Sequence, residues 1–249
     1  MKVMLLAAGK GTRLGSRTRK VPKVLIPVLG RTILEHNLRF LKRNGFREII
    51  LNLHAGAKQV AGFLKRSRNF GLRIKLSYEE ELLGTAGAVK NMHGEWKDDF
   101  LVFYGDNLTD FNIPNLIRFH KKTGAVATLG VFHPERAFHT GILAGQVKIK
   151  RGGEVEKFIE KRNNRAVSAD GYVNAGIAVF SPKILEFIPS GHFCDFARDV
   201  YPRLLKEKKK IFAAEGARFL LASDTPETLR ETRKMAAKYF RKKGKDRCI

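Results

Sequence analysis

Short apolar runs alternate with segments of helical periodicity over the first 132 residues, and this alternation constrains the fold more than any other feature. Strand-like runs lie at residues 2–8, 48–53, 72–78, 100–104 and 125–132. Helical patterns lie between them, at residues 32–43, 57–66, 85–93 and 113–122. In the first helical pattern, Leu34, Leu38 and Leu41 fall on one face. Such alternation predicts an α/β fold, in which a mainly parallel sheet carries helices on both faces.

The pattern changes after residue 140. Strands are expected at residues 142–150, 155–159 and 172–180, and helices at 195–206 and 226–243. Turn signals at 151–153 and 170–171 separate the strands, which indicates a small mixed or antiparallel subregion laid against the Rossmann-like main sheet. Because the chain has no internal repeat and no linker-like stretch, we expect one domain over residues 1–225. Residues 226–249 would form a basic C-terminal helix and tail, packed on that domain or trailing from it.

The excess of positive charge indicates an anionic partner. Lys and Arg total 48 and Asp and Glu total 24, so the formal net charge is +24. Nucleic acid, an anionic membrane surface and phosphorylated small molecules are the classes that fit. The absence of a helix-turn-helix pattern, and of aromatic residues interleaved with basic ones, argues against nucleic acid.

Membrane and secretory classes are not favoured by the sequence. No apolar run approaches the roughly 18 residues that a membrane span needs. The apolar start stops at Gly9 without a cleavage pattern, so we interpret it as a first buried strand. The two cysteines cannot form a disulfide framework. These features predict a cytoplasmic protein without a membrane span.

A glycine loop follows the first strand, as Leu6-Ala-Ala-Gly-Lys-Gly-Thr-Arg-Leu14, with Pro22-Lys23 after it. Glycines let the backbone approach a bound group, and its N–H groups can hold phosphate. The loop is not a P-loop, because Lys10 lies between the glycines, and Leu14 breaks the dinucleotide fingerprint. In parallel sheets ligands bind at the carboxyl ends of strands, where this loop and Gly105-Asp106 both fall.

The loop resembles that of the sugar-phosphate nucleotidyltransferases, and further motifs of this family follow in the same order along residues 1–230. They are Pro27-Val28-x-Gly30, Ile33-Leu-Glu-His36, Leu83-Gly-Thr-Ala-Gly-Ala88, Gly105-Asp106, Phe158-Ile-Glu-Lys161, Asn174-Ala-Gly-Ile177 and Asp195-Phe-Ala-Arg-Asp-Val200. The last segment looks most like that of mannose-1-phosphate guanylyltransferases.

The resemblance implies a reaction. A phosphate oxygen of a sugar 1-phosphate attacks the α-phosphorus of a nucleoside triphosphate, giving a nucleotide-sugar and pyrophosphate. The nucleophile is already ionised, so the protein needs no strong general base. It must bring two anions together and stabilise the departing charge, a task for Lys, Arg, backbone N–H groups and Mg²⁺.

The family match implies roles for particular residues. Arg13 would stabilise the leaving pyrophosphate, Lys23 would hold phosphate across the reacting centre, and Asp106 would bind Mg²⁺. The nucleotide would contact Leu6, Ala8, Gly9, Gly11, Thr12, Glu79, Gly84 and Thr85.

On the sugar side, the small subregion would bind the sugar 1-phosphate. The match implies contacts from Glu160, Lys161, Asn174 and the backbone of Gly141. Arg162 replaces the proline that the family carries after Glu-Lys, which leaves this loop less rigid.

The nucleobase is indicated by Glu79, which falls where the family contacts the base edge. A carboxylate only accepts hydrogen bonds, which suits the paired N1–H and N2–H donors of guanine. Cytosine, with its N4–H donor, is another match. Glu80 and Glu81 are adjacent, so the alignment can slip and the cluster can be a solvated one.

A second metal ligand is ambiguous in the sequence. Relatives carry an aspartate near the end of the domain, and here either Ala222 or, with a two-residue deletion, Asp224 falls on that position. Asp224 or Thr225 can instead cap the helix that Pro226 opens.

The leading expectation is an enzyme that joins GTP to mannose 1-phosphate, or to a similar hexose or heptose 1-phosphate, with Mg²⁺. UTP, dTTP or CTP with a glucose-type phosphate is the alternative. A non-catalytic binding subunit on the same fold also stays open, as does a homodimer formed through surface helices.

Overall fold

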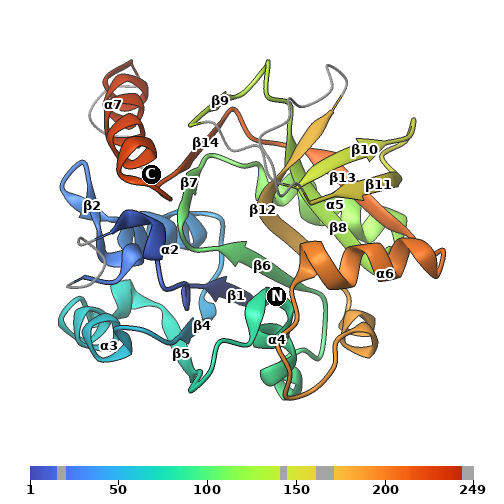
Figure 1. The fold of residues 1–249 in the computed structure, drawn as a ribbon, viewed down its shortest axis with the longest axis horizontal. Helices are drawn as coiled ribbons and strands as arrows, with labels where there is room; N and C mark the ends of the chain where they lie inside the picture. The colour runs from blue at the N-terminus through green and yellow to red at the C-terminus, as the bar shows by residue number, and fades with distance from the viewer. Residues whose placement is uncertain (16–20, 141–144, 161–170, 243–249) are drawn as a thin grey trace.

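A nine-stranded sheet runs through the molecule (Figure 1). The computed structural model describes residues 1–15, 21–140, 145–160 and 171–242. Four strands make the parallel half of the sheet: β1 (Val3–Leu6), β4 (Glu48–Leu53), β5 (Arg73–Tyr78) and β6 (Phe100–Tyr104). β1 lies between β4 and β6 and is parallel to both, and β5 lies beyond β4. The carboxyl ends of these strands therefore meet at one edge.

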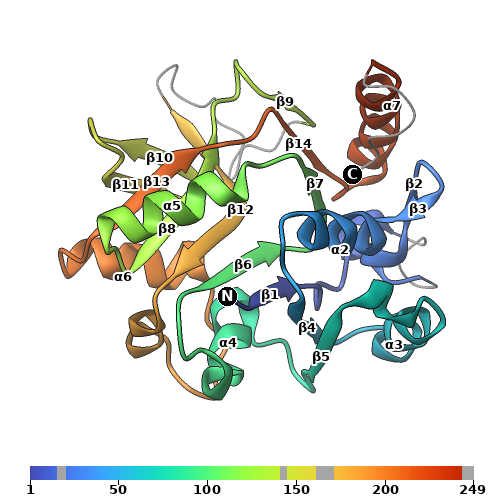
Figure 2. The ribbon, with the colours of Figure 1, turned by 180° about the vertical axis from the view of Figure 1, so that it is seen from behind.

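Helices cover both faces of the sheet, and a separate apolar core lies under each set. α2 (Ile33–Arg43), α3 (Ala57–Arg66) and α5 (Ile113–Thr123) share one core with Val3 and Leu5 of β1. α4 (Gly84–Asn91) and α6 (Tyr201–Lys206) share the other core with Met4. Figure 1 shows α4 and α6 in front, and Figure 2, from behind, shows α2 and α5. The alternation of side chains along a strand thus sends neighbours in β1 to opposite cores.

The local sequence explains where α2 begins. Thr32 precedes the helix, and its hydroxyl accepts a hydrogen bond from the backbone N–H of Glu35 at 3.0 Å. This is the pattern of an N-cap, which satisfies one of the backbone donors that a helix start leaves without a partner. Lys42 and Arg43 lie in the last turn, where positive charge is favourable.

The antiparallel half of the sheet is built around β12 (Tyr172–Phe180), which runs antiparallel to β6 with Ile177 opposite Phe103. β12 also pairs with β8 (Ala127–Phe132) and β10 (Gln146–Ile149). β11 (Val155–Ile159) pairs antiparallel with β10, and β13 (Ile211–Glu215) pairs parallel with β8. We expected this subregion to lie against the main sheet. It continues that sheet instead, because β12 hydrogen-bonds directly to β6.

A three-stranded sheet joins distant parts of the chain, with β7 (Asn107–Thr109), β14 (Phe219–Ala222) and β9 (Phe138–His139) in the order β7-β14-β9. Ala222 lies opposite Asn107 in this sheet. This pairing brings the chain after Asp106 beside the chain before Asp224.

The C-terminal helix α7 (Pro226–Lys242) packs on the rest of the chain. Its Leu229 and Ala236 are fully buried in the core that α2 shares. The Arg233 guanidinium donates two hydrogen bonds to the carbonyl oxygen of Pro27. Pro27 lies in β2 (Pro27–Val28), which pairs with β3 (Arg31–Thr32).

The fold class predicted from the sequence is confirmed, as is the position of each regular element predicted before residue 133. The helix expected at 195–206 forms as a π-helical turn, Phe196–Val200, that continues into α6. The strand expected at 142–150 is described only from residue 145 onward, where β10 begins at Gln146. In the described part of the chain, no helix has the length and apolar character needed to cross a membrane.

Candidate active site

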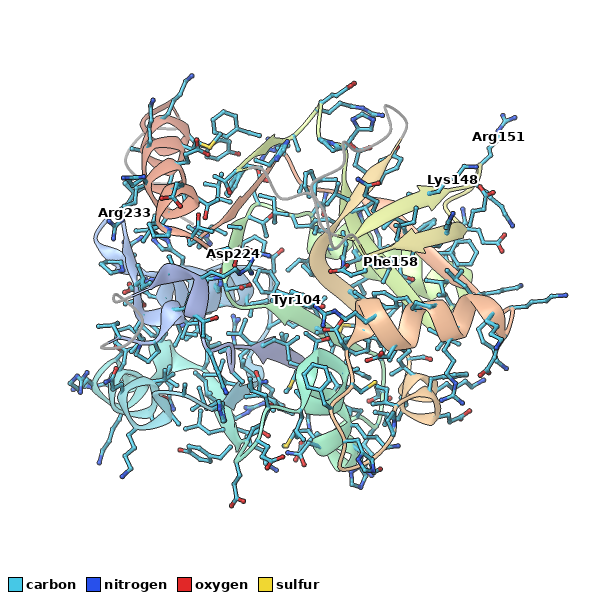
Figure 3. The ribbon with its side chains drawn as sticks, viewed as in Figure 1. Tyr104, Lys148, Arg151, Phe158, Asp224 and Arg233 are labelled. Atoms are coloured by element: carbon cyan, nitrogen blue, oxygen red, sulfur yellow. The ribbon has the colours of Figure 1, made fainter. Side chains whose placement is uncertain are left out.

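A cavity of about 290 Å³ opens at the carboxyl ends of the parallel strands. Its lining residues come from β1, β4, β6 and α4, from the loops after β1, β5 and β6, and from the segment before α6: Leu6, Ala7, Ala8, Gly9, Lys23, Val24, Asn52, Glu79, Leu82, Gly84, Thr85, Tyr104, Asp106, Phe193 and Asp195. Figure 3 labels Tyr104 and Asp224 near the middle of the molecule, whereas Lys148, Arg151 and Arg233 lie at its periphery.

One end of the cavity holds a cluster of charges around Lys23. The side chain of Lys23 is only 7% exposed, and its ammonium donates to Asp106 Oδ2 at 2.7 Å and to Asp224 Oδ1 at 2.5 Å. Arg13 Nη2 lies 3.3 Å from the same Asp224 oxygen. Two cations and two carboxylates thus share one small volume.

Two members of this cluster, Lys23 and Asp106, are held in their ionised forms by their neighbours. Burial disfavours the Lys23 ammonium, but the Asp106 and Asp224 carboxylates outweigh it and raise the pKa of Lys23. Burial likewise acts to raise the pKa of Asp106, but Lys23 and Arg13 outweigh it and lower that pKa. Lys23 and Asp106 therefore both stay charged at neutral pH.

The backbone explains how Asp106 comes to this position. Gly105 follows β6, and a Cβ built on it would lie 2.7 Å from the Leu6 carbonyl oxygen of β1, so a larger residue does not fit. The amide of Gly105 donates to that oxygen at 2.8 Å, and the Gly105 carbonyl accepts from Asn37 Nδ2. These contacts fix the turn that presents the Asp106 carboxylate to Lys23.

The structure brings Asp224, and not Ala222, to Lys23. Ala222 is a buried residue of β14, and its carbonyl oxygen accepts hydrogen bonds from Thr140 and Thr232. The start of α7 is capped by Thr225, whose hydroxyl accepts from the amide of Thr228. Because Thr225 serves as the cap, the Asp224 carboxylate can contact Lys23 and Arg13 instead.

The donor set of this cluster fits a magnesium ion that arrives with a phosphate. Mg²⁺ in nucleotide sites is held by one or two carboxylates together with substrate phosphates and water. Asp106 and Asp224 supply two such carboxylates, and both contact the ammonium of Lys23. Among the described residues no group of three or more His, Cys, Asp or Glu side chains could hold an ion. The other ligands would have to be phosphate oxygens and water.

The glycine loop divides between the cavity wall and a turn beside it. Leu6, Ala8 and Gly9 line the cavity. Gly11 has a φ of 63° and precedes a 3₁₀ turn at Thr12–Leu14, and neither it nor Thr12 is a lining residue. Arg13 lies on this turn, and its side chain is 71% exposed although it contacts Asp224.

Another part of the cavity wall is built around Glu79, which is buried beyond the end of β5. Its Oε1 accepts from Asn52 Nδ2 at 2.7 Å, and its Oε2 accepts from the Leu83 amide at 3.1 Å. Asn52 Oδ1 in turn accepts from the Ala7 amide. The Glu79 carboxylate is thereby fixed relative to the glycine loop, and each of its oxygens keeps a second lone pair.

Gly84 and Thr85 open α4 against the segment that precedes α6. The Cys194 carbonyl accepts from the amides of Ala86 and Gly87, both at 3.0 Å, so it caps α4. Thr85 Oγ1 donates to Asp195 Oδ2 at 2.9 Å. This contact places Asp195 in the cavity wall.

Two of the predicted sugar-side residues, Glu160 and Asn174, lie near each other on either side of Gly145. A Cβ built on Gly145 would lie 3.1 Å from Asn174 Cβ and 3.6 Å from Glu160 Oε2. Burial raises the pKa of Glu160, and the Asp195 carboxylate raises it further. Burial, together with the Asp195 carboxylate, also raises the pKa of the Tyr104 hydroxyl, which therefore stays protonated.

The other two residues predicted to contact the sugar phosphate are Gly141 and Lys161. Both lie outside the described residues.

Sequence reasoning missed three polar residues of the cavity wall. Asn52 is a polar residue within the otherwise apolar end of β4, and Tyr104 directly precedes Gly105-Asp106. Asp195 caps the turn before α6 by accepting from the amides of Ala197 and Arg198. A polar residue within a buried strand, and a capping aspartate in a matched motif, are the signals that could have found them.

The cavity lies at the carboxyl ends of parallel strands, which is where α/β proteins of this class generally bind their ligands. The chain belongs to the nucleotidyl transferase family, whose model matches residues 2–219. The resemblance noted in the sequence is thereby confirmed.

The curated relatives include a protein named as a uridylyltransferase and proteins named as guanylyltransferases. UTP–glucose-1-phosphate uridylyltransferase of Synechocystis sp. is 30% identical over 226 residues, which cover 86% of this chain and 57% of that protein. Mannose-1-phosphate guanylyltransferase of Mycobacterium tuberculosis is 30% identical over 228 residues, covering 90% and 61%. The chain thus spans about three fifths of the length of the curated relatives it matches.

Solved structures share the fold. HddC from Yersinia pseudotuberculosis, complexed with GMP-PN, has a TM-score of 0.77 at 23% identity, over 94% of this chain and 98% of its own. A putative glucose-1-phosphate thymidylyltransferase from Bacillus anthracis has a TM-score of 0.77 at 21% identity, over 94% of each chain.

Proposed function

We propose that this protein is a sugar-1-phosphate nucleotidyltransferase, which joins a nucleoside triphosphate to a sugar 1-phosphate and releases pyrophosphate. The observation that carries the proposal is the cluster of Lys23, Asp106, Asp224 and Arg13 at the end of a cavity lined by the glycine loop. Fixed cations beside paired carboxylates suit a reaction between two phosphate groups.

The proposed chemistry needs no general base. An ionised oxygen of the sugar phosphate attacks the α-phosphorus, a new oxygen–phosphorus bond forms, and the bond to the bridging oxygen of the β-phosphate breaks. Both electrons of the broken bond leave with pyrophosphate. Lys23 would hold phosphate at the reacting centre, because its ammonium is buried and charged. The exposed Arg13 guanidinium would neutralise the leaving group.

Asp106 and Asp224 would hold Mg²⁺ in this proposal. The ion would neutralise phosphate charge and orient the triphosphate when bound. The two carboxylates contribute by fixing its place, since both are oriented by hydrogen bonds to the Lys23 ammonium.

GTP is the proposed nucleotide, with mannose 1-phosphate or a similar hexose or heptose 1-phosphate as its partner. The fixed carboxylate of Glu79 supports this choice, because it offers acceptors to the paired N1–H and N2–H donors of guanine. Glu160 and Asn174, with Lys161 and the backbone of Gly141, would contact the sugar phosphate. UTP with a glucose-type phosphate is the second candidate, favoured by the similarity to the Synechocystis protein.

Residues 1–225 would make up the catalytic domain, with the helix and tail of residues 226–249 as its C-terminal addition. The helix would act as a support for the catalytic cluster, because α7 begins two residues after Asp224 and its Thr232 hydroxyl donates to the Ala222 carbonyl. Residues 243–249 lie outside the described part of the chain.

Pyrophosphate release tests the proposal. The wild-type protein is assayed with Mg²⁺ against a grid of the common nucleoside triphosphates and hexose, N-acetylhexosamine and heptose 1-phosphates. Release is expected in the GTP column and should fall at least about a hundredfold in Arg13→Ala, because Arg13 acts on the developing charge. Arg39→Ala, which removes an exposed cation from α2, is the matched control and should keep full activity. A grid without release would overturn the proposal.

A further inference from the structure

An exposed aromatic ring lies at the mouth of the candidate nucleotide cavity. Phe193 is 58% exposed, yet it lines the same cavity as Glu79 and Leu82. The other large apolar side chains that are exposed in the described part of the chain do not line this cavity. A phenylalanine left in water loses the favourable burial that such a ring normally gains, so its position here calls for an explanation.

The backbone directly after Phe193 is held by hydrogen bonds to α4 and to the residue before that helix. The Cys194 amide donates to the Leu83 carbonyl at 2.9 Å, and the Cys194 carbonyl caps α4. Phe193 Cε2 would lie 3.2 Å from a Cβ built on Gly84, so the ring lies against the start of α4. Because the ring projects from a fixed segment, its exposure is a property of the fold and not of a loose loop.

Within the described residues, no aromatic ring or cation is found stacked on Phe193. Its ring face is therefore available to a flat ligand. Glu79 supplies an acceptor edge in the same cavity, and Leu82 supplies apolar surface. An aromatic face together with an acceptor edge is what a nucleobase needs for recognition, since every base has a π-face and a hydrogen-bonding edge.

We propose that Phe193 stacks on the nucleobase and thereby favours purine over pyrimidine triphosphates. This inference rests on the proposed function, because it takes the cavity as the nucleotide site. A purine offers two fused rings to the phenyl face where a pyrimidine offers one, so the stacking contact is larger for GTP than for UTP. Phe193 would act on nucleotide affinity and base selectivity and leave the transfer of the nucleotidyl group itself unchanged.

Equilibrium binding separates this role from catalysis. The dissociation constant of GTP and of UTP is measured by calorimetry, with Mg²⁺ and without sugar phosphate, for the full chain and its variants. Phe193→Leu should weaken GTP binding roughly 5- to 150-fold, the range known for loss of a stacked aromatic side chain. UTP binding should weaken less. Tyr78→Leu is the matched control, because Tyr78 is 59% exposed on β5 and does not line the cavity.

A fluorescent variant reports stacking directly. The chain has one tryptophan, Trp96, which is 3% exposed, so an indole introduced by Phe193→Trp can be distinguished by its solvent-exposed emission. GTP should quench this emission, and Phe193→Trp should keep the GTP affinity of the wild type. Tyr78→Trp should show no quenching.

The outcomes distinguish the inference from the function it rests on. If the wild type binds GTP and Phe193→Leu binds it equally well, stacking is refuted while the nucleotide site stands. If the wild type releases pyrophosphate with a pyrimidine triphosphate alone, the purine preference is refuted. If the wild type binds no nucleoside triphosphate, both the inference and the proposed function fail.

Discussion

At the scale of single residues, the charge cluster depends on one buried lysine. Lys23 is held between Asp106 and Asp224, and each carboxylate is stabilised in turn by a nearby cation. Removing one member of such a cluster leaves the others without compensation. We therefore interpret Lys23 as the residue that organises the proposed phosphate site.

The proposed contact between Glu79 and the nucleobase gives the first prediction. Glu79→Gln replaces one acceptor oxygen with an NH₂ group, which must then face either Asn52 Nδ2 or the Leu83 amide, both donors. It also removes an acceptor from the proposed guanine edge. The ratio of kcat/KM for GTP to that for UTP should fall at least about tenfold. Steady-state kinetics measures this ratio, and Glu80→Gln, on the exposed neighbour, is the control. An unchanged ratio in Glu79→Gln would refute the role in base recognition.

The sequence predicted some of these residues and missed others for physical reasons. Lys23 and Asp106 lie in short motifs, so the family match located them. Asp224 stayed ambiguous against Ala222 because a two-residue gap cannot be placed from one sequence, and the pairing of β7 with β14 decides which residue meets Lys23. Asn52 was missed because its partners Ala7 and Glu79 are distant along the chain.

At the scale of elements, the contact between α4 and the segment before α6 positions one wall of the cavity. Gly84 has a φ of 74°, and a Cβ on it would lie 2.4 Å from the Cys194 carbonyl oxygen. Only a residue without a side chain allows this approach. The hydrogen bonds from Ala86 and Gly87 to that oxygen depend on it.

The second prediction follows from this contact. Gly84→Ala should lower the free energy of unfolding by about 2–4 kcal/mol, since both the left-handed backbone and the overlap with Cys194 are unfavourable. Gly124→Ala is the control, because Gly124 also has a left-handed φ of 58° but no atom lies within 4 Å of its Cβ position. It should cost about 1–2 kcal/mol. Urea unfolding of both variants checks the difference, and equal losses would contradict the steric account.

A surface cluster of Lys2, which precedes β1, Lys75 of β5 and Glu95 in the turn after α4 gives a pH-dependent prediction. The Lys2 and Lys75 ammonium groups each lie 2.6 Å from an oxygen of Glu95, and these hydrogen bonds lower the pKa of Glu95 to about 2. A lowered pKa stabilises the fold above the ordinary value of 4.5, and this contribution is lost as the pH falls toward 2. Because the cluster is partly solvated, Glu95→Gln should cost about 1 kcal/mol at neutral pH.

Urea unfolding of wild type and Glu95→Gln tests this from neutral pH down to about pH 3. The difference between the two proteins should shrink as the pH falls below 4.5. A difference that stays constant over that range would show that the variant acts through packing and not through the ion pairs.

The elements that the sequence failed to predict are short or lack a strong pattern. β7 and β9 have three and two residues, too few for any periodicity. β13 and β14 are short apolar runs, Ile-Phe-Ala-Ala-Glu and Phe-Leu-Leu-Ala, whose pairing with β8 and β7 comes from distant parts of the chain. The long strand β12 was expected, but its pairing with β6 depends on topology, so the union of the two halves in one sheet could not be predicted.

At the scale of the whole molecule, the net charge of +24 exceeds what one phosphate site needs. Many of the cations lie outside the cavity, as Lys148, Arg151 and Arg233 do in Figure 3. A positive field of this size attracts anionic substrates over distances comparable to the Debye length, about 10 Å at 0.1 M salt. We interpret part of the excess as electrostatic steering.

The fourth prediction concerns this field. The association rate constant of GTP, measured by stopped flow with the Phe193→Trp variant, should fall several-fold between about 0.05 M and 0.5 M NaCl, while the dissociation rate changes less. A sucrose solution of matched viscosity and low salt is the control. If the association rate is independent of salt, the charge excess plays no part in substrate capture.

The most direct test of the central claim is ³¹P NMR of the wild-type protein with GTP, a sugar 1-phosphate and Mg²⁺. Our account predicts that the signals of the triphosphate and the sugar phosphate decline together. Those of pyrophosphate and of a diphosphate diester linking guanosine to the sugar should rise in equal amounts. Release of inorganic phosphate with GDP, or unchanged substrates under all combinations of the grid, would contradict a nucleotidyl transfer at this site.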